Sequence, residues 1–509
     1  MNVLDILYDY QKEAVTRTFY NPKGIICLPT GTGKTFAQAA MIANDIIMNP
    51  NQFRMYVINA PRIILTFQLL KETYYFLTSN GIDSRYMFVH SGGSSDEKEL
   101  EEIRIQSNLD GNKIPFSEIG SSTNPLEIKK MIKKAKQQDM PLVFFSTYNS
   151  AEKIEQARSN IKQPITLVVN DEAHYLVQEQ FHNILHDLKS SRCYFFTATM
   201  INTPSDKGRG MNNEESYGKI LYMMTPREAI DIGKMVRPRM HVVTTDGVYN
   251  TDDYNKSLNY IIKNSFEQHK KVLPKLKPKL LISVKGTQDI KSFLESKEYK
   301  QLLTQGVSIY AVASNDEIGN DINSEKVRRQ EFLKRLKADG ADKEKEIIVL
   351  HFDILAEGID VSGFTGIMPL RSLNKSKFLQ TFGRAARLDS EDRDKLEKDE
   401  FVPDELDKMN KPYAYIIIPN IIHSNDDDKQ NITHLITELR SYGFNPSEDI
   451  ISSSIVNGIP EIDDLEGLND IKIKLPNIGE LIENLEAEIE AEENAKLTKK
   501  EFLLKNLQT

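Results

Sequence analysis

Short apolar runs rich in valine, isoleucine and phenylalanine recur along the chain, separated by polar segments with helical character. Runs of this length are typical of strands buried on both faces, and such strands form parallel sheets when helices connect them. The rhythm therefore predicts an α/β fold with helices flanking a doubly wound parallel sheet. In the first part of the chain the runs lie at residues 24–29, 55–61, 142–148, 165–172 and 193–199.

A second series of apolar runs follows, so the sequence predicts two α/β domains. Between the two series, Pro238 and a cluster of polar residues indicate a linker. The second series lies at residues 279–284, 307–313, 346–352, 366–370 and 413–419. We expect a first domain over residues 1–235, a linker over 236–255, a second domain over 256–420, and an acidic, mainly helical extension over 421–509.

Two segments depart from this rhythm. Residues 91–140 form a polar excursion inside the first domain that ends in a basic helix, "EIKKMIKKAKQ". Residues 478–505 carry leucine and isoleucine at helical spacing among many glutamates. This second pattern predicts a helix that packs on the core, and a partner-binding coiled coil is the alternative.

Charge is distributed unevenly along the chain, whose net charge is −9 over 509 residues. Residues 389–509 hold 29 acidic and 13 basic side chains, a net charge of −16, which leaves +7 on residues 1–388. The acidic total therefore does not exclude nucleic acid, because binding depends on a local basic groove.

Cysteine content and hydropathy indicate the compartment. Cys27 and Cys193 are the two cysteines, far apart in sequence, so we expect neither a disulfide framework nor a cysteine metal site. The chain shows no secretory signal and no apolar stretch near the ~18 residues of a membrane span. We expect a cytoplasmic protein, of a bacterial cell or a virus-infected host, with no membrane partner.

The segment "LPTGTGKT" at residues 28–35 lies between a predicted strand and a predicted helix, the context of a phosphate-binding loop. Gly31 and Gly33 let the backbone curve so that N–H groups face phosphate oxygens. Lys34 would reach the β- and γ-phosphates of ATP, and the Thr35 hydroxyl would bind Mg²⁺. Leu28 stands where the general pattern has glycine, and an ordinary glycine-rich turn is the alternative. The expected ATP-binding residues of this loop are Thr30, Gly31, Thr32, Gly33, Lys34 and Thr35.

The segment "LVVNDEAHYL" at residues 167–176 places two carboxylates at the end of a predicted strand, where open α/β sheets bind ligands. Asp171 suits a contact to the phosphate-bound Mg²⁺, and Glu172 suits the alignment and deprotonation of an attacking water. A solvated strand end is the alternative for an acidic pair on its own.

The segment "LQTFGRAARL" at residues 379–388 carries Arg384 and Arg387, whose spacing predicts one shared helix face. A transferring γ-phosphoryl group carries negative charge that an arginine from another domain can stabilise. These arginines lie in the second domain and the phosphate loop in the first, so they would meet only if the domains close on the nucleotide. Two surface arginines on an amphipathic helix are the alternative.

With these motifs in view, the chain resembles a superfamily 2 helicase or translocase of the DEAH-box-like class, with two tandem RecA-like domains. The resemblance covers about residues 1–420 and follows the family's motif order. Besides the three motifs above, it rests on "YDYQKEAV" (8–15), "APRIILTFQ" (60–68), "STYNS" (146–150), "TAT" (197–199), "LLISVKGTQ" (280–288) and "AEGIDVSG" (356–363).

The resemblance implies further roles. Gln11 would recognise adenine, and Gln380 would contact the γ-phosphate together with the arginines. Gly358 and Asp360 would contact the nucleotide from the second domain. Coupling of hydrolysis to movement would involve His174, Thr197 and Thr199. The nucleic-acid backbone would be held by Pro61, Arg62, Thr147, Tyr148 and Ser283. ATP and Mg²⁺ are the implied cofactors.

The same resemblance favours DNA, single-stranded, forked or duplex, as the polymer. Residues 217–240 are similar to the corresponding region of restriction-motor-like and phage DNA helicases, and the "QTFGRAAR" motif lacks the histidine common in DEAD-box RNA helicases. RNA remains an alternative, as does a motor subunit of a restriction, defence or replication complex that docks a protein partner through its acidic C-terminal region. A non-catalytic, nucleotide-switched scaffold is a third hypothesis, disfavoured because the hydrolytic residues are all present.

Overall fold

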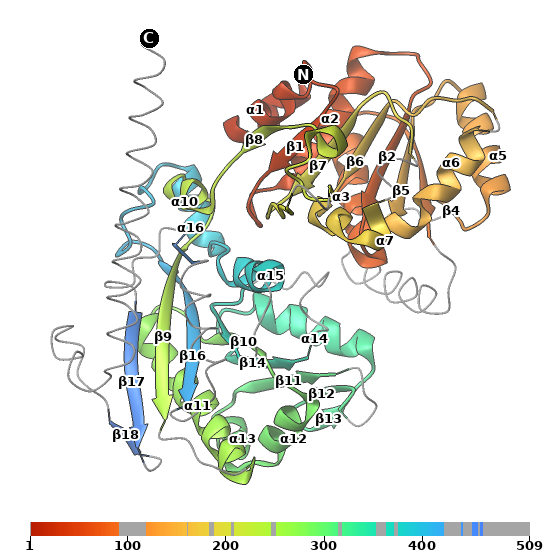
Figure 1. Cartoon of the computed structure of the whole chain (residues 1–509). Helices are drawn as coiled ribbons and strands as arrows, with labels where there is room; N and C mark the ends of the chain where they lie inside the picture. The colour runs from red at the N-terminus through yellow and green to blue at the C-terminus, as the bar shows by residue number, and fades with distance from the viewer. Residues whose placement is uncertain are drawn as a thin grey trace.

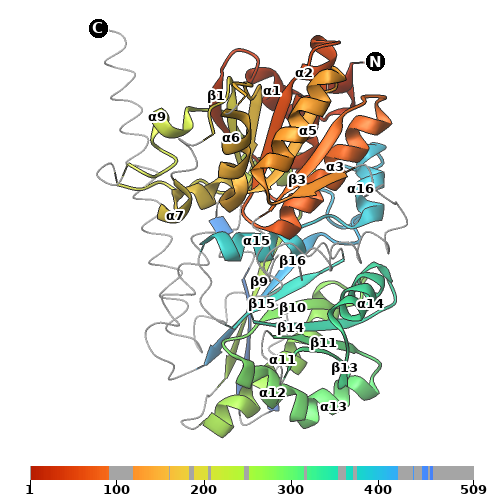
Figure 2. The ribbon, with the colours of Figure 1, turned by 90° about the vertical axis from the view of Figure 1, so that its right-hand side faces the viewer.

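The computed structural model shows two α/β domains, one following the other along the chain (Figure 1). Figure 2 shows the molecule turned by 90°, with α15 (Lys375–Ala385) at the junction of the domains. The structure describes residues 2–90, 119–159, 161–182, 188–204, 208–245, 251–313, 318–352, 363–370, 375–421, 439–440, 450–456 and 459–461.

The first domain is built on a sheet whose eight described strands are all parallel. Their spatial order is β4 (Ile119–Ser122), β3 (Arg85–Val89), β5 (Leu142–Thr147), β2 (Met55–Ala60), β6 (Leu167–Asn170), β7 (Cys193–Thr197), β1 (Lys23–Cys27) and β8 (Lys219–Met223). The central strands are buried on both faces, which explains their continuous apolar sequences. The predicted strands of this domain are therefore confirmed.

Helices cover both faces of this sheet. Along β2, Tyr56 and Ile58 pack with α1 (Asp9–Arg17), α2 (Lys34–Met48) and α3 (Ile63–Ser79). Met55 and Val57 point to the opposite face and pack with α5 (Pro125–Gln137) and α6 (Ala151–Ser159). The helix expected at the end of the polar excursion is thus present as α5. Shorter elements are η1 (Val3–Ile6), η2 (Tyr148–Ser150), η3 (Ala173–Val177), α7 (Glu179–His182), α9 (Glu214–Tyr217) and α10 (Pro226–Asp231).

The second domain contains a sheet of ten described strands, parallel at its centre and antiparallel at both ends. Its order is β13 (Glu325–Lys326), β12 (Asn320–Ile322), β11 (Ser308–Val312), β14 (Ile347–His351), β10 (Lys279–Ser283), β15 (Gly366–Pro369), β16 (Tyr413–Ile421), β9 (Arg237–Thr245), β17 (Ile450–Val456) and β18 (Ile459–Glu461). All five strands expected for this domain are confirmed.

The helices of the second domain divide between the two faces of its sheet. One face packs against α11 (Thr251–Val272), α12 (Thr287–Glu295) and α13 (Lys297–Thr304). The other face packs against α14 (Arg329–Ala341) and α15, whose buried side chains belong to the same apolar cluster as the core of the first domain. A further helix, α16 (Ser390–Glu397), follows α15. Met235 and Val236, which lie between α10 and β9, belong to this apolar cluster.

The predicted linker over residues 236–255 is wrong for its described part. Residues 237–245 form β9, which pairs with β16 over nine residues and with β17 on its other side. Pro238 had indicated a break, but a proline is tolerated near the beginning of a strand. Residues 251–255 already belong to α11. The crossing between the sheets is therefore short, running from the end of α10 to Arg237.

The second domain also extends beyond residue 420, where the sequence predicted a mainly helical extension. Residues 450–461 instead contribute β17 and β18 to the second sheet. The sequence "IISSSIV" alternates too weakly to be identified as a strand, and β9 supplies the edge that orders it. The helix expected over residues 478–505 lies outside the described residues. In the described part of the chain, no helix is both long and apolar enough to cross a membrane.

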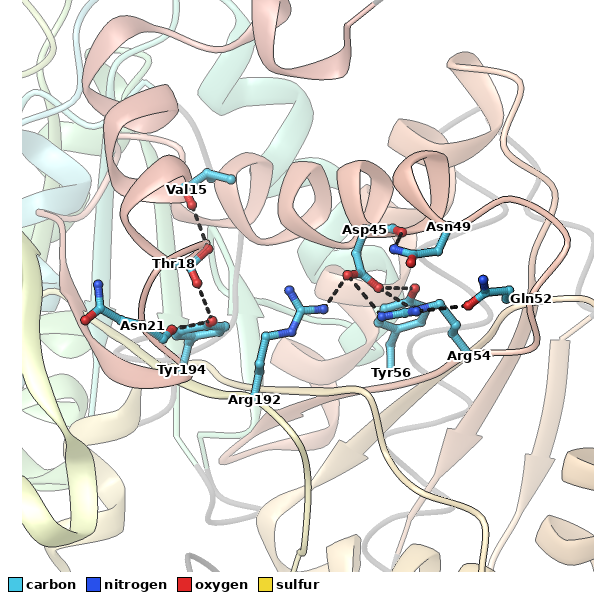
Figure 3. Close-up of polar contacts among 10 residues, drawn as sticks. All are labelled: Val15, Thr18, Asn21, Asp45, Asn49, Gln52, Arg54, Tyr56, Arg192 and Tyr194. Atoms are coloured by element: carbon cyan, nitrogen blue, oxygen red, sulfur yellow. Dashed lines mark hydrogen bonds and ion pairs between the residues drawn. The ribbon is translucent and has the colours of Figure 1, made fainter.

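A buried ionic network fixes α2 to the first sheet (Figure 3). The carboxylate of Asp45 accepts hydrogen bonds from Arg54 Nε at 2.8 Å, from the Tyr56 hydroxyl at 2.7 Å and from the Arg192 guanidinium. The Asp45 side chain is only 8% exposed. The Asp45 carboxylate on α2 thus accepts hydrogen bonds from residues at the beginning of β2 and of β7. Its removal would leave Arg54 and Arg192 without their shared acceptor.

We predict that Asp45→Ala lowers the free energy of unfolding of the first domain by about 3 kcal/mol, because a buried charge partner is lost from two arginines and a phenol. Urea unfolding followed by circular dichroism would measure the change. Asp5→Ala is the matched control, since Asp5 pairs with Lys12 at side-chain exposures of 58% and 42%. An exposed pair contributes less than about 1 kcal/mol. Equal losses in the two variants would contradict the assigned role of Asp45.

A second buried polar cluster lies in the core of the second domain. His241 on β9 shares a hydrogen bond with the hydroxyl of Tyr415, and the ring of His269 on α11 meets Tyr415 edge-on at 5.4 Å. Neither ring nitrogen of His269 has a hydrogen-bond partner among the described residues. Burial lowers the pKa of His241 to about 4, and burial, with a contribution from Lys411, lowers that of His269 to about 3.

These depressed pKa values predict that the second domain loses stability in acid. Both histidines are neutral in the folded state, so their contribution is complete above the unfolded pKa of about 6.5 and is lost as pH falls toward their folded values. Between pH 7 and pH 5 we expect a loss on the order of 2 kcal/mol per histidine. Thermal unfolding at several pH values would show it. His269→Leu should flatten the dependence, and an unchanged slope in that variant would exclude His269 as a source.

Candidate functional site

The phosphate loop lies at the carboxyl end of β1, immediately before α2. Gly31 and Gly33 both adopt positive φ angles, 90° and 76°, which favour glycine. Gly33 is the N-cap of α2, so the first N–H groups of that helix face the loop. The side chain of Lys34 folds back, and its Nζ donates to the carbonyl of Leu28 at 3.3 Å. The structure thus builds the anion-binding turn that the sequence indicated.

Residues of the N-terminal segment hold the phosphate loop in place. Gln11 Nε2 donates to the carbonyls of Thr32 at 2.9 Å and Gly33 at 3.2 Å, and its Oε1 accepts from the backbone N–H of Tyr8. The hydroxyl of Tyr10 donates to the same Thr32 carbonyl at 2.8 Å. Gln11 therefore lies at the nucleotide loop with its amide engaged by protein, and recognition of adenine by this residue stays a prediction.

The carboxylates Asp171 and Glu172 follow β6, one strand away from β7 and two from the phosphate-loop strand β1. Gln38 on α2 donates to Asp171 Oδ1 at 2.7 Å, and the Tyr148 hydroxyl donates to the Asp171 carbonyl at 2.6 Å. Burial, and then the charge of Glu172, raise the pKa of Asp171 well above its ordinary range, while Lys34 lowers it. Glu172 has a left-handed backbone, with φ of 48°, which turns the chain sharply.

This donor set fits a magnesium ion held together with nucleotide phosphates. Two adjacent carboxylates lie near Lys34, and burial, followed by the charge of Glu172, raises the pKa of Asp171. Mg²⁺ commonly uses one or two protein oxygens and takes its other ligands from phosphates and water. Asp171 and the hydroxyl of Thr35, the second residue of α2, supply such oxygens. Among the described residues, no group of three or more His, Cys, Asp or Glu could hold a metal by itself.

A chain of polar contacts links the carboxylates to the segment after β7. His174 Nδ1 lies 3.4 Å from Glu172 Oε2 and 3.2 Å from the Thr197 hydroxyl. The Thr197 hydroxyl donates to the Thr199 carbonyl at 2.8 Å. His174 is therefore placed between Glu172 and Thr197, the position that the resemblance assigned to a coupling residue. That role itself stays a prediction.

The second domain reaches the phosphate loop through the end of α15. A Cβ atom at Gly383 would lie 2.9 Å from the Cβ of Thr30, and one at Gly31 would lie 3.8 Å from the Cγ of Arg387. These contacts join segments 350 residues apart in the sequence, across the two domains. The side chain of Arg387 thus lies near Gly31 of the phosphate loop, and its contact with the γ-phosphate stays a prediction.

The expectation that Arg384 and Arg387 share a helix face is wrong. The helix α15 ends at Ala385, so Arg384 is its penultimate residue and Arg387 lies in the turn beyond it. Beyond the end of α15, the carbonyl of Ala386 accepts a hydrogen bond from the backbone N–H of Val236, which lies outside the helix, at 2.9 Å. The second domain has three other residues expected to contact the nucleotide. Gln380 lies within α15, and its side chain is not among those that the structure describes. Gly358 and Asp360 lie outside the described residues.

The five residues expected to hold nucleic acid divide into two groups. Arg62 is exposed and Pro61 half-buried directly after β2, and Thr147 ends β5 beside it, so these three lie at one sheet edge. Thr147 is buried at 6% exposure, and Tyr148 and Ser283 are buried at 1% each, so protein encloses these side chains. A contact of these residues with the polymer stays a prediction. Tyr148 supports Asp171, as described above, and the Ser283 hydroxyl bonds His351 Nε2 at 2.9 Å inside the second domain.

Three residues at the site were not found by sequence reasoning. Tyr10 and Gln38 are ordinary helical residues in sequence, and only the packing of α1 and α2 reveals that they hold the phosphate loop and Asp171. Gly383 did carry a signal, because a glycine inside an otherwise good helix indicates close approach of another segment. Its contact with Thr30 supplies the reason.

Residues 5–202 match the family model described as the res subunit of type III restriction enzymes. A comparison with curated protein sequences finds no match. The matched part contains the phosphate loop, both carboxylates and the threonines after β7, which are the residues that the first domain brings together.

Solved structures with a similar fold include restriction enzymes and a helicase. A DNA-bound ATP-dependent type ISP restriction-modification enzyme, LlaBIII, matches 90% of this chain with a TM-score of 0.64 at 16% identity. A fragment of an HsdR subunit of a type I restriction enzyme from Vibrio vulnificus matches 91% with a TM-score of 0.54 at 15% identity. The DNA-bound DUF1998 helicase MrfA matches 86% with a TM-score of 0.51 at 13% identity.

The shares of these proteins that are covered differ. This chain covers 72% of the HsdR fragment and 50% of MrfA. It spans about a third of the length of the type ISP enzymes, 32% of LlaBIII and 29% of a nuclease-deletion mutant of LlaGI. At these identities the likeness shows the fold alone, two tandem RecA-like domains. The family match covers residues 5–202, which lie within the first domain.

Proposed function

We propose that this protein is a motor that moves along DNA by hydrolysing ATP between its two RecA-like domains. The observation that carries the proposal is the meeting of the segment after α15 with the phosphate loop across the domain boundary. A nucleotide bound at the loop would contact both domains at once. Its binding and hydrolysis would therefore change the distance between the domains, which is the stroke of a motor.

The first domain supplies the binding and activation of the nucleotide. The N–H groups of residues 30–35 hold the β- and γ-phosphates, and Lys34 turns from the Leu28 carbonyl to reach them. Asp171 and Thr35 would hold Mg²⁺, whose charge would offset the charge that develops on the phosphates. Glu172, turned by its left-handed backbone, orients the attacking water and accepts its proton.

The second domain supplies positive charge to the transition state. Arg387 already lies against Gly31, so a small closure brings its guanidinium to the γ-phosphate. Arg384 and Gln380 on the preceding helix, with Gly358 and Asp360, complete the proposed contacts from this domain. The contacts of His174 with Glu172 and Thr197 give hydrolysis a direct route to the segment after β7. This route is the proposed coupling path.

DNA is the proposed polymer because LlaBIII and MrfA, which match over most of this chain, are described as bound to DNA. Arg62, Pro61 and Thr147 lie together at one sheet edge and would hold the phosphate backbone independently of sequence. RNA is the alternative, and the assay below distinguishes the two.

A second candidate function is a motor subunit within a restriction or related defence assembly. It is supported by the family match and by the small share of the type ISP enzymes that this chain spans. In such an assembly DNA cleavage or modification would be performed elsewhere, and a protein partner would dock on the C-terminal region.

The proposal predicts an ATPase that is stimulated by DNA. Turnover measured with no polymer, single-stranded DNA, forked DNA, duplex DNA and RNA should rise at least about tenfold with one of the DNA forms. Lys34→Ala should abolish hydrolysis, because the phosphates lose their cation. Glu172→Gln should bind ATP but not turn over. Stimulation by RNA alone would replace DNA as the polymer, and equal rates with and without any polymer would exclude the motor.

Gly383→Ala should lower stimulated ATP turnover by about tenfold, equivalent to ~1.4 kcal/mol of activation free energy. The added methyl group would lie 2.9 Å from Thr30 Cβ and so hold α15 away from the phosphate loop. Binding of ATP to the first domain should change little, because the loop is intact. Gly286→Ala is the control, since a Cβ there meets no atom within 4 Å. Normal turnover in Gly383→Ala would show that the active state does not use this approach.

A further inference from the structure

The turn that carries Arg387 has an unusual support. The helix α15 ends at Ala385, so the carbonyls that follow have no partner within the helix. Two hydrogen bonds from elsewhere in the chain satisfy them: Val236 N–H donates to the Ala386 carbonyl at 2.9 Å, and Lys411 Nζ donates to the Arg387 carbonyl at 2.7 Å. The second of these bonds acts on the residue that approaches the phosphate loop.

Lys411 is buried, at 4% exposure, immediately before β16. Its ammonium also donates to the carbonyl of Phe364 at 2.8 Å, just before β15, so it joins the turn to the neighbouring strand. Its backbone N–H and that of Asn410 donate to the two carboxylate oxygens of Asp392, each at 2.8 Å. Lys411 is thus anchored to α16 at its backbone and to the turn at its side chain.

Burying an ammonium group at this place has a cost. Burial lowers the pKa of Lys411 to about 7, although Asp389 and Asp392 favour its charged form; Arg387 adds to the lowering. A hydrophobic residue of similar length would avoid that cost, but it could not donate to two carbonyls. Burial of Lys411 therefore lowers the stability of the domain, but its two hydrogen bonds fix the geometry of the turn that carries Arg387.

We propose that Lys411 is a positioning residue for Arg387, fixing the peptide carbonyl from which that side chain begins so that the guanidinium meets the γ-phosphate. The inference rests on the proposed function of Arg387. Arg384 needs no such support, because it lies within α15. Arg387 lies beyond the helix, where one backbone rotation would swing its side chain away from Gly31. A preorganised charge is more effective in a transition state than one that must be ordered during the reaction.

Lys279 provides an internal comparison for a purely structural role. It is also buried, at 5% exposure, and its Nζ donates to the carbonyls of Gly340 and Asp342, both at 2.6 Å, at the end of α14. The two lysines thus have the same chemistry in the same domain. They differ in the segment that they hold, since Lys279 supports α14 and Lys411 supports the turn of Arg387.

The test compares Lys411→Met with Lys279→Met in the full chain. For both variants we would measure the unfolding temperature, and kcat and KM for ATP with saturating DNA. Lys411→Met should lower kcat about tenfold with KM changed less than twofold. Lys279→Met should lower the unfolding temperature while kcat stays within twofold of the unchanged protein. An equal effect of the two variants on kcat would overturn the proposal.

A double-mutant cycle with Arg387→Ala separates this proposal from the proposed function. If Lys411 acts through Arg387, Lys411→Met should have no further effect on kcat in the Arg387→Ala background. Additive losses would overturn the positioning role while leaving Arg387 in place. Normal turnover of Arg387→Ala alone would instead overturn the role of the arginine. If Lys411→Met does not fold, Lys411→Gln, which keeps a shorter N–H donor, enters the same cycle, and additive losses there would equally overturn the positioning role.

Discussion

The approach of Gly383 to Thr30 is the contact on which the functional interpretation depends. Each domain by itself is a largely parallel sheet covered by helices, and neither contains both the phosphate loop and the arginines proposed for the γ-phosphate. The absence of a side chain at Gly383 lets α15 come within van der Waals distance of the loop. Because one apolar cluster includes buried residues of both domains, this approach is also supported by packing.

Much of the fold could be predicted because buried parallel strands have a distinctive composition. Ten apolar runs became strands, and the phosphate loop followed from its place after one of them. Several of the strands that were missed lie where the signal is weak. β4 reads "IGSS", β8 is an edge strand with three of its five residues exposed, and β9 contains a proline and charged residues. Their pairing partners, which lie far away in sequence, determine these strands.

The site was predictable to a similar degree and for a related reason. Lys34, Asp171 and Glu172 occur in short local motifs, so their chemistry is visible in a single stretch. The orientation of Tyr148 and Ser283 is not local, since strand ends carry both exposed and buried side chains, and both residues proved to be buried supports. The spacing of Arg384 and Arg387 suggested one helix face, but where a helix ends depends on what receives its last carbonyls.

Because the end of α15 depends on partners far away in the sequence, the sequence around Lys411, which precedes "PYAYIIIP", does not indicate a role in nucleotide chemistry. Its sequence context indicates only the start of a strand. In the structure, the turn after α15, the start of β15 and the start of β16 meet around the ammonium group of Lys411. A charge at that point is costly to bury, so its presence needs a compensating gain. Holding a second charge, Arg387, in position against the phosphate loop of the other domain is a gain of the right kind, because the transition state then meets an arginine that is already ordered.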